Sequence, residues 1–540
     1  MKTKIMAVAA AALITLGSCE NNFDPNLYGS LTPENYPTTE AEYTSYMMTC
    51  YLPFTIVWTY DMGSAGVQHG WFVPVGGVLR MFDATSDICG VVKTHGGGWT
   101  YLTQANYDQS VYYWRGSVSD DASLNHFPKT AQVTRMTEII GTLENAPENV
   151  LKPEVKESLI GEARACRGLM MYYLLHNFGP VRVILDPEKV TDSETLGNTE
   201  RPTLDEMCGW IYDDFEYAAS KAPATAPNKG RFTADFARFC LMRHCLNEGG
   251  HIAGYYKKGM EMYDQLKGKY SLYDNGNNPY ADLFLNANKF NKEIIMAISA
   301  DETADGNPKH GNFWPFLMHA LPADVAKEDP FPMGGGWIQL YSVDQKFYDT
   351  FESSDKRRQT ILSSYKCQDG STVGKANIGV RWNGYIINKW PQETRTTFQG
   401  QDFPMARYAD VLLMYAELDA RMNNRVSADA VKAVNDVRSR AGLGGLPSSA
   451  TASTDAFLDA ILLERAHELF FEGNRKIDLI RYNRYAQAVY QGKGCMPTHQ
   501  YMPIPNYAVE QAEKEGHILE QTYERDGWKE DKAKANPSTI

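Results

Sequence analysis

Residues 407–417 read Arg-Tyr-Ala-Asp-Val-Leu-Leu-Met-Tyr-Ala-Glu, and this stretch decides the fold class of the 540-residue chain. Within residues 408–422, apolar side chains recur three or four positions apart, at Val411, Leu412, Tyr415 and Ala416. That spacing places them on one face of an α-helix. We therefore predict a helix over residues 408–422.

Similar patterns lie on both sides of this stretch. Downstream they predict helices over 427–441 and 454–472, which end at Gly442 and Gly473. Upstream they predict helices over 153–177, from 203 onward, over 233–248 and over 254–268, and a short strand at 293–298. Thr203 and Glu206 have the spacing of a capping box. Helix pairs of this length are typical of tetratricopeptide-type stacking, although the strict 34-residue consensus is absent.

Two sections of the chain lack any sustained hydrophobic periodicity. Residues 41–130 and about 270–400 are rich in glycine and aromatic residues. Loops of this length are normally functional. The predicted fold is therefore mostly α, with tetratricopeptide-like helix pairs as scaffold, long loops and a few short strands.

The N-terminus has the pattern of an export signal. Lys2 and Lys4 precede an apolar run over 5–16, which is too short to span a bilayer. The sequence Leu-Gly-Ser before Cys19 resembles a bacterial lipobox, so we predict cleavage before Cys19 and its lipidation. The alternative is an ordinary secretory signal that happens to contain cysteine. We expect a signal peptide at 1–18, a tether at 19–40 and one body at 41–540, with an N-terminal part (41–270) and a C-terminal part (271–540).

Charge and cysteine content narrow the function classes. The net charge of −13 argues against nucleic acid as a partner, because such proteins carry a basic stripe. Eight cysteines besides Cys19 permit disulfides outside the cytoplasm. Several of them lie in apolar helical patterns and no CxxC motif occurs, so we expect mostly free, buried thiols.

The carboxylates with catalytic spacing have a structural explanation. Glu464, Glu468 and Glu472 recur every four residues, with Arg465 and Arg475 nearby. A carboxylate pair can serve a glycosidase, but carboxylates on one helix face beside arginines indicate an ion network. We predict no catalytic residues.

Metal motifs are incomplete. His467-Glu468 begins a zinc motif, but Phe471 stands where the second histidine must be. Cys240 and His244 lie one helical turn apart, and we expect them in the core. The loop at 274–278 places glycine where a calcium ligand is needed. We predict no metal site and no cofactor.

Several segments, in order along the chain, resemble the SusD/RagB family, the surface lipoproteins of Bacteroidetes nutrient-uptake systems. They are residues 162–168, 172–173, 177–181, 201–203, 230–233, 280–284, 407–417, 434–443, 464–481 and 502–505. The resemblance implies a SusD-like body that binds glycan without catalysis at the outer membrane. It also implies a SusC-like, TonB-dependent transporter as partner. The alternatives are a peptide-binding, RagB-like member and, remotely, a surface glycosidase.

Aromatic residues in the two loop-rich sections are the candidate ligand contacts. Trp99 and Trp337 each follow three glycines, which suits a loop that lets Trp reach outward. Aromatic faces stack on sugar rings, while charged groups bond the hydroxyls. For any single Trp, core packing is the alternative. The predicted ligand-binding set is Trp71, Arg80, Asp87, Trp99, Tyr101, Trp114, Trp314 and Trp337.

Overall fold

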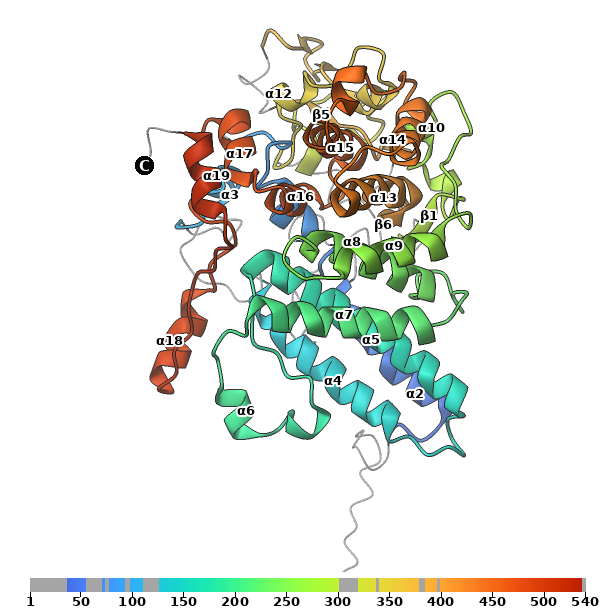
Figure 1. The fold of residues 1–540 in the computed structure, drawn as a ribbon. Coiled ribbons are helices and arrows are strands. Elements are labelled where there is room, and N and C mark those ends of the chain that lie inside the picture. Colours follow the sequence, from blue (N-terminus) through green and yellow to red (C-terminus); the bar gives the residue numbers. More distant parts are fainter. Residues whose placement is uncertain are drawn as a thin grey trace, which may run out of the picture.

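The computed structural model describes most of the chain (Figure 1). The described residues are 36–54, 70–72, 77–92, 98–109, 126–300, 319–336, 339–377, 384–395 and 399–536. The predicted signal peptide, the lipidation site Cys19 and most of the tether lie outside them. Within these ranges, no helix is both long enough and apolar enough to cross a membrane.

Helices dominate the described structure. The N-terminal half contains α2 (Glu40–Met48), α3 (Gly98–Thr103), α4 (Thr130–Glu144), α5 (Pro153–Phe178), α6 (Ser193–Gly197), α7 (Leu204–Lys221), α8 (Ala234–Glu248), α9 (Tyr255–Leu266) and α10 (Pro279–Asp282). The C-terminal half contains α12 (Gln345–Tyr348), α13 (Tyr408–Asn423), α14 (Ala428–Arg440), α15 (Thr454–Leu469), α16 (Arg475–Arg481), α17 (Tyr485–Lys493), α18 (Asn506–Lys514) and α19 (Trp528–Ala535).

The long helices form one continuous stack. α4 packs on α5, α5 on α7, α7 on α8 and α8 on α9. α9 packs on α13, which also contacts α14 and α15, so the two halves share one core (Figure 1). This is the predicted arrangement of helix pairs, in which each helix buries its apolar face against its neighbours in the chain.

Local sequence signals set the helix boundaries as predicted. α5 begins at Pro153 and ends at Gly179, whose φ is +75°. α7 begins with the predicted capping box, in which Thr203 and Glu206 each bond the other's backbone N–H. α8, α9, α13 and α14 lie within about two residues of the predicted bounds.

The structure differs from the prediction at one helix end, and it contains helices that were not predicted, among them α4, α6 and α16 to α19. α15 ends at Leu469 rather than at residue 472. The chain turns there because Phe471 and Gly473 both have positive φ, and the turn directs Glu472 toward Arg407 and Lys389. α4 was not predicted, although its buried residues have helical spacing.

The strands are short, and the β1–β6 pair joins distant parts of the chain. In the described residues they form three antiparallel pairs: β1 (Ile294–Ile298) with β6 (Phe403–Arg407), β2 (Ile361–Leu362) with β5 (Ile386–Ile387), and β3 (Tyr365–Lys366) with β4 (Thr372–Val373). β1 matches the strand predicted at 293–298. β6 leads directly into α13. Residues 339–377 and 384–395 lie over one end of the helical stack (Figure 1), and we call them the loop layer.

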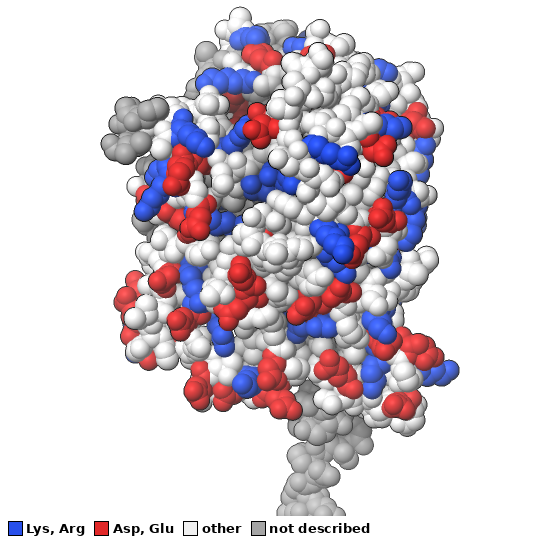
Figure 2. All heavy atoms as spheres, viewed as in Figure 1, with Lys and Arg blue, Asp and Glu red and all other residues white. Residues whose placement is uncertain are grey.

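The surface charge agrees with the composition. Figure 2 shows acidic and basic side chains interspersed over one face, with the acidic ones gathered toward its lower end. The coloured residues form no continuous basic stripe on this face.

Candidate functional site

The two loop-rich sections meet in the structure. Cys89 forms an isolated antiparallel bridge with Val343. Next to it, the Gly90 N–H donates to the Ser342 carbonyl at 3.0 Å, and the Asp344 N–H donates to the Ile88 carbonyl at 2.9 Å. Backbone hydrogen bonds therefore connect segments about 250 residues apart. A ligand face built from both sections remains a prediction, and this pairing makes it geometrically feasible.

Trp99 does not project outward, and here the sequence-based expectation is wrong. Its side chain is 1% exposed and meets the Tyr341 ring edge-on, with ring centroids 5.4 Å apart. The Arg80 guanidinium carbon lies 5.5 Å from the Trp99 ring, and Arg80 is itself buried. Trp99 lies in the first turn of α3, whose Thr103 hydroxyl donates back to the Trp99 carbonyl. The turn directs the indole into the junction between the two loop sections.

Trp71 is also a core residue. It is fully buried and stacks on His126, with centroids 4.0 Å apart and an interplanar angle of 7°. Its indole N–H donates to the Met170 sulfur on α5 at 3.1 Å. Lys129 lies 5.3 Å from the ring, and burial lowers the pKa of Lys129 to about 7. This indole anchors the N-terminal loops to the helical stack and has no exposed ring face.

Asp87 and Tyr101 are the predicted ligand residues with exposed atoms in the described structure. Asp87 accepts two hydrogen bonds from Arg475, at 2.8 and 2.7 Å, and its side chain is 16% exposed. It borders a groove of about 360 Å³, the Asp87 groove. Its lining includes Lys346, Phe347, Thr350, Arg475, Arg484, Gln487 and Gln491. Tyr101 is half-buried. Trp114, Trp314 and Trp337 lie outside the described residues.

A larger groove was missed by the sequence analysis. It has a volume of about 780 Å³ and lies beside α9, α13 and α14. Tyr263 and Tyr415 stack in its wall, with centroids 4.0 Å apart, and Tyr408 lies beside them. The signal available was the seven-residue spacing of Tyr408 and Tyr415, which puts both rings on one helix face. Burial raises the pKa of both stacked tyrosines, so their hydroxyls stay protonated.

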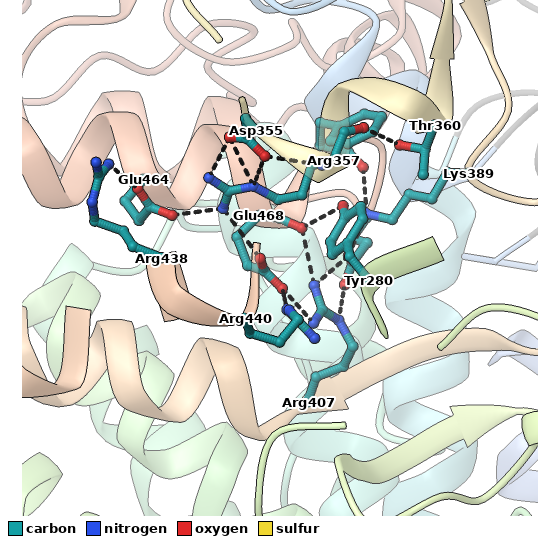
Figure 3. Close-up of polar contacts among 12 residues, drawn as sticks. Tyr280, Asp355, Arg357, Thr360, Lys389, Arg407, Arg438, Arg440, Glu464 and Glu468 are labelled. Atoms are coloured by element: carbon teal, nitrogen blue, oxygen red, sulfur yellow. Dashed lines mark hydrogen bonds and ion pairs between the residues drawn. The ribbon is translucent and has the colours of Figure 1, made fainter. Parts of the chain in front are cut away.

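The predicted ion network exists and is larger than expected. We call it the arginine–glutamate cluster (Figure 3). Its members are Glu293, Asp355, Arg357, Lys389, Arg407, Arg438, Arg440, Glu464, Glu468 and Glu472. The basic side chains of the cluster all lie outside α15. Arg465 and Arg475, which the sequence suggested as partners, are not among them. Arg465 instead pairs with Asp410 and Asp478.

Glu468 lies at the centre of the cluster. One carboxylate oxygen accepts from Arg407 at 2.9 Å and from Arg440, and the other accepts from Arg357 at 3.2 Å. Burial alone would raise the pKa of Glu468, but the three arginines outweigh it and lower the pKa to about 2. A buried carboxylate that stays ionised and fully paired is unsuited to act as a general acid. The geometry therefore supports the structural interpretation over the glycosidase one.

The cysteines are free thiols throughout the described residues. Cys240 and His244 are both buried, as predicted for core residues. His244 contacts the Cys208 carbonyl through Nε2 at 3.0 Å, and burial lowers its pKa to about 4. His244 is therefore neutral near pH 7.

Comparison with known proteins identifies the chain's relatives. A "SusD-like protein" from Bacteroides ovatus is 24% identical over 401 residues, which cover 70% of this chain and 69% of that protein.

Solved structures share the fold. A "Laminarin binding SusD-like protein" superposes with a TM-score of 0.68 at 20% identity and covers 90% of this chain and 99% of its own. "Surface glycan-binding protein A" from Bacteroides thetaiotaomicron, solved with laminarihexaose, gives 0.67 at 18% identity, covering 90% and 100%. "B. fragilis NanU" gives 0.66 at 18% identity, covering 89% and 97%.

The family assignment rests on the C-terminal half together with these relatives. Residues 293–532 match the model of the SusD family, and they include β1, β6, α13 and all ten members of the arginine–glutamate cluster. The motifs quoted from the sequence at 407–417 and 464–481 fall inside this match. The chain therefore belongs to the SusD/RagB family.

Proposed function

We propose that this protein binds a glycan at the cell surface and does not cleave it. The observation that carries the proposal is the likeness of the fold, over 90% of the chain, to a surface glycan-binding protein solved with laminarihexaose. The arginine–glutamate cluster supports the non-catalytic part, because its carboxylates are buried and paired with cations.

We place the ligand face where the two loop-rich sections meet. In this proposal Trp99, Arg80 and Tyr341 form a buried scaffold under the face. The ligand contacts in this proposal come from Asp87 and Tyr101, which have exposed atoms, and from the predicted residues Trp114, Trp314 and Trp337. Arg475 holds the Asp87 carboxylate in a fixed orientation, so it can accept sugar hydroxyls without losing further side-chain entropy.

We further propose that the protein is anchored to the outer membrane through lipidated Cys19 and delivers its ligand to a SusC-like, TonB-dependent transporter. The lipobox-like sequence before Cys19 and the family membership support this role. Two or three acyl chains suffice for stable anchoring, because each buried CH₂ contributes about 0.8 kcal/mol.

Affinity electrophoresis in gels cast with single polysaccharides tests the binding function. Laminarin is the first probe because of the relatives above, followed by starch and a mucin glycan. We expect retardation in at least one gel, with no new reducing ends after incubation. Release of reducing ends would support the glycosidase alternative. Absence of retardation in every gel, together with binding of mixed oligopeptides, would replace the glycan proposal by the peptide-binding alternative.

A matched pair of variants tests the location. Trp337→Ala should weaken binding about five- to 150-fold, because an aromatic stacking platform contributes about 1–3 kcal/mol. Trp210→Ala is the control, since Trp210 is a half-buried indole on α7, outside the loop-rich sections. Equal binding by both variants, with unchanged melting temperatures, would remove Trp337 from the ligand face.

A further inference from the structure

Four metal-ligating side chains converge where the start of α7 meets the end of α8. Asp205 and Cys208 lie near the start of α7, and Glu248 is the last residue of α8, with His251 in the turn that follows. The two helices pack against each other. Each pair has i, i+3 spacing, which puts both of its side chains on one helix face. The fold thus brings together two short motifs, Asp-x-x-Cys and Glu-x-x-His.

The donor atoms are close enough to share one ion. A Cys208 sulfur, a Glu248 oxygen and a His251 nitrogen all lie within 4.8 Å of one another. His251 Nε2 is 3.7 Å from the Glu248 carboxylate and 3.5 Å from Asp205 Oδ1. Ligands around a tetrahedral zinc ion lie roughly 3.3–3.8 Å apart, given bonds of about 2.0–2.3 Å. Cys208, Glu248 and His251 therefore need a contraction of at most about one ångström, and Asp205 lies beside His251.

We propose that Cys208, Glu248 and His251, with Asp205 as the fourth ligand, form a structural zinc site that ties α7 to α8. The donor set selects the metal. A thiolate and an imidazole suit zinc and similar ions, whereas calcium and magnesium require oxygen ligands. Four protein donors leave no open position for substrate or water, which is typical of a structural site.

Arg525 holds Glu248 in place behind the ligands. Its two Nη atoms donate to the two Glu248 oxygens, at 2.8 and 3.0 Å. Burial alone would raise the pKa of Glu248, but Arg525 and His176 outweigh it and lower the pKa to about 2. A carboxylate has about four lone-pair positions, so two remain for a metal while Arg525 is bound. Such outer contacts orient the ligands and strengthen a metal site.

The site is reachable from solvent on one side. Cys208 and Glu248 are buried, whereas the side chains of His251 and Asp205 are 35% and 74% exposed. The Cys208 thiol hydrogen-bonds to Glu248, and burial raises its pKa. Zinc takes the place of this thiol proton: the S–H bond breaks, a Zn–S bond forms, and one proton is released to solvent.

Cobalt(II), which reports its ligands by colour, tests the proposal on the chelator-treated, purified protein. We expect one equivalent to bind with a sulfur-to-cobalt charge-transfer band and tetrahedral visible bands, and zinc to displace it. Zinc should also raise the melting temperature, because it binds the folded state. Binding without a charge-transfer band, or no binding, would overturn the proposal.

Matched variants identify the ligands. Cys208→Ser should abolish the charge-transfer band. His251→Gln should weaken binding about 10- to 100-fold or more. His251 is exposed, so this variant tests the site even where Cys208→Ser fails to fold. His499→Gln is the control, because His499 contacts two carboxylates, Asp108 and Glu524, and should bind cobalt as the parent protein does. A band that persists in Cys208→Ser, or equal affinities in the two histidine variants, would refute the assignment.

Discussion

Substituting Glu468 by glutamine tests how the arginine–glutamate cluster stabilises the fold. Glutamine keeps the shape of the side chain but removes its charge and turns one acceptor into an amide donor. Glu468 is fully buried and accepts hydrogen bonds from Arg357, Arg407 and Arg440 (Figure 3). The cluster holds five acidic and five basic groups, so the substitution leaves one uncompensated positive charge in the interior.

The expected effect is large. Breaking a buried ion pair by removing one partner costs about 3–5 kcal/mol of unfolding free energy. Unfolding entropy is about 2.1 cal/mol/K per residue, which for roughly 500 residues gives about 1 kcal/mol per degree. The melting temperature should therefore fall by about 3–5 °C, provided that the chain unfolds as one unit. Differential scanning calorimetry measures both the shift and that cooperativity.

Glu352→Gln is the matched control. Glu352 also accepts from an arginine, Arg438 at 2.8 Å, but its side chain is 56% exposed. Exposed pairs contribute at most about 1 kcal/mol, so this variant should melt within about one degree of the parent protein. Equal shifts in Glu468→Gln and Glu352→Gln would refute the reasoning that burial makes the cluster important.

The same cluster predicts a pH dependence. The folded-state pKa of Glu468 is about 2, below the ordinary value of 4.5. The stability that its charge contributes is therefore complete above pH 4.5 and is lost as the pH falls toward 2. The difference in melting temperature between the parent protein and Glu468→Gln should shrink over that range. A difference that stays constant from pH 7 to pH 3 would contradict the assigned ionisation.

Three further substitutions test other parts of the structure. Gly473 has a φ of +80°, and an added Cβ would lie 2.7 Å from Val78, so Gly473→Val should lose roughly 1–3 kcal/mol. Gly494 has a φ of +72° and open space around it, so Gly494→Val should lose less stability. Equal melting temperatures in the Gly473→Val and Gly494→Val variants would contradict the predicted clash with Val78. Trp99→Ala should lose about 3–5 kcal/mol, because its indole is buried; an unchanged melting temperature would show that the ring does not pack the core. Cys19→Ala should release the protein from the membrane fraction, and a variant that stays bound without a transporter present would disprove the lipid anchor.

Periodicity and caps predicted the helical scaffold well. The stretch at 407–417 became the end of β6 and the first part of α13, and Thr203 with Glu206 formed the predicted capping box. These signals are local: spacing within one helix, or hydrogen bonds within one turn. Stacking then follows, because each amphipathic helix must bury its apolar face against a neighbour.

The features that the sequence did not predict depend on distant partners. Trp99 looked like an outward-reaching residue because three glycines precede it, yet Tyr341, more than 200 residues away, gives it a buried neighbour. Similarly, the end of α15 moved to Leu469 because Glu472 pairs with Arg407 and Lys389. The closeness of Cys208 and His251 could not be predicted for the same reason. It depends on α7 and α8 meeting at those ends, which neither local sequence shows.

The arginine–glutamate cluster explains how a loop layer with only short strands is held in one orientation on the helical stack. Arg357 and Lys389 come from the loop layer, and they pair with Glu464 and Glu472 on or after α15. Arg407, at the end of β6, completes the link to the helical stack. Apolar burial does not fix the orientation of the layer, whereas these directional hydrogen bonds do. A shifted layer would leave buried charges unpaired, and each would cost several kcal/mol of folding free energy. The Val343 bridge to Cys89 lies in the same layer. The cluster thus fixes the layer to which the segment beside Asp87 is bridged, although none of its members needs to touch a ligand.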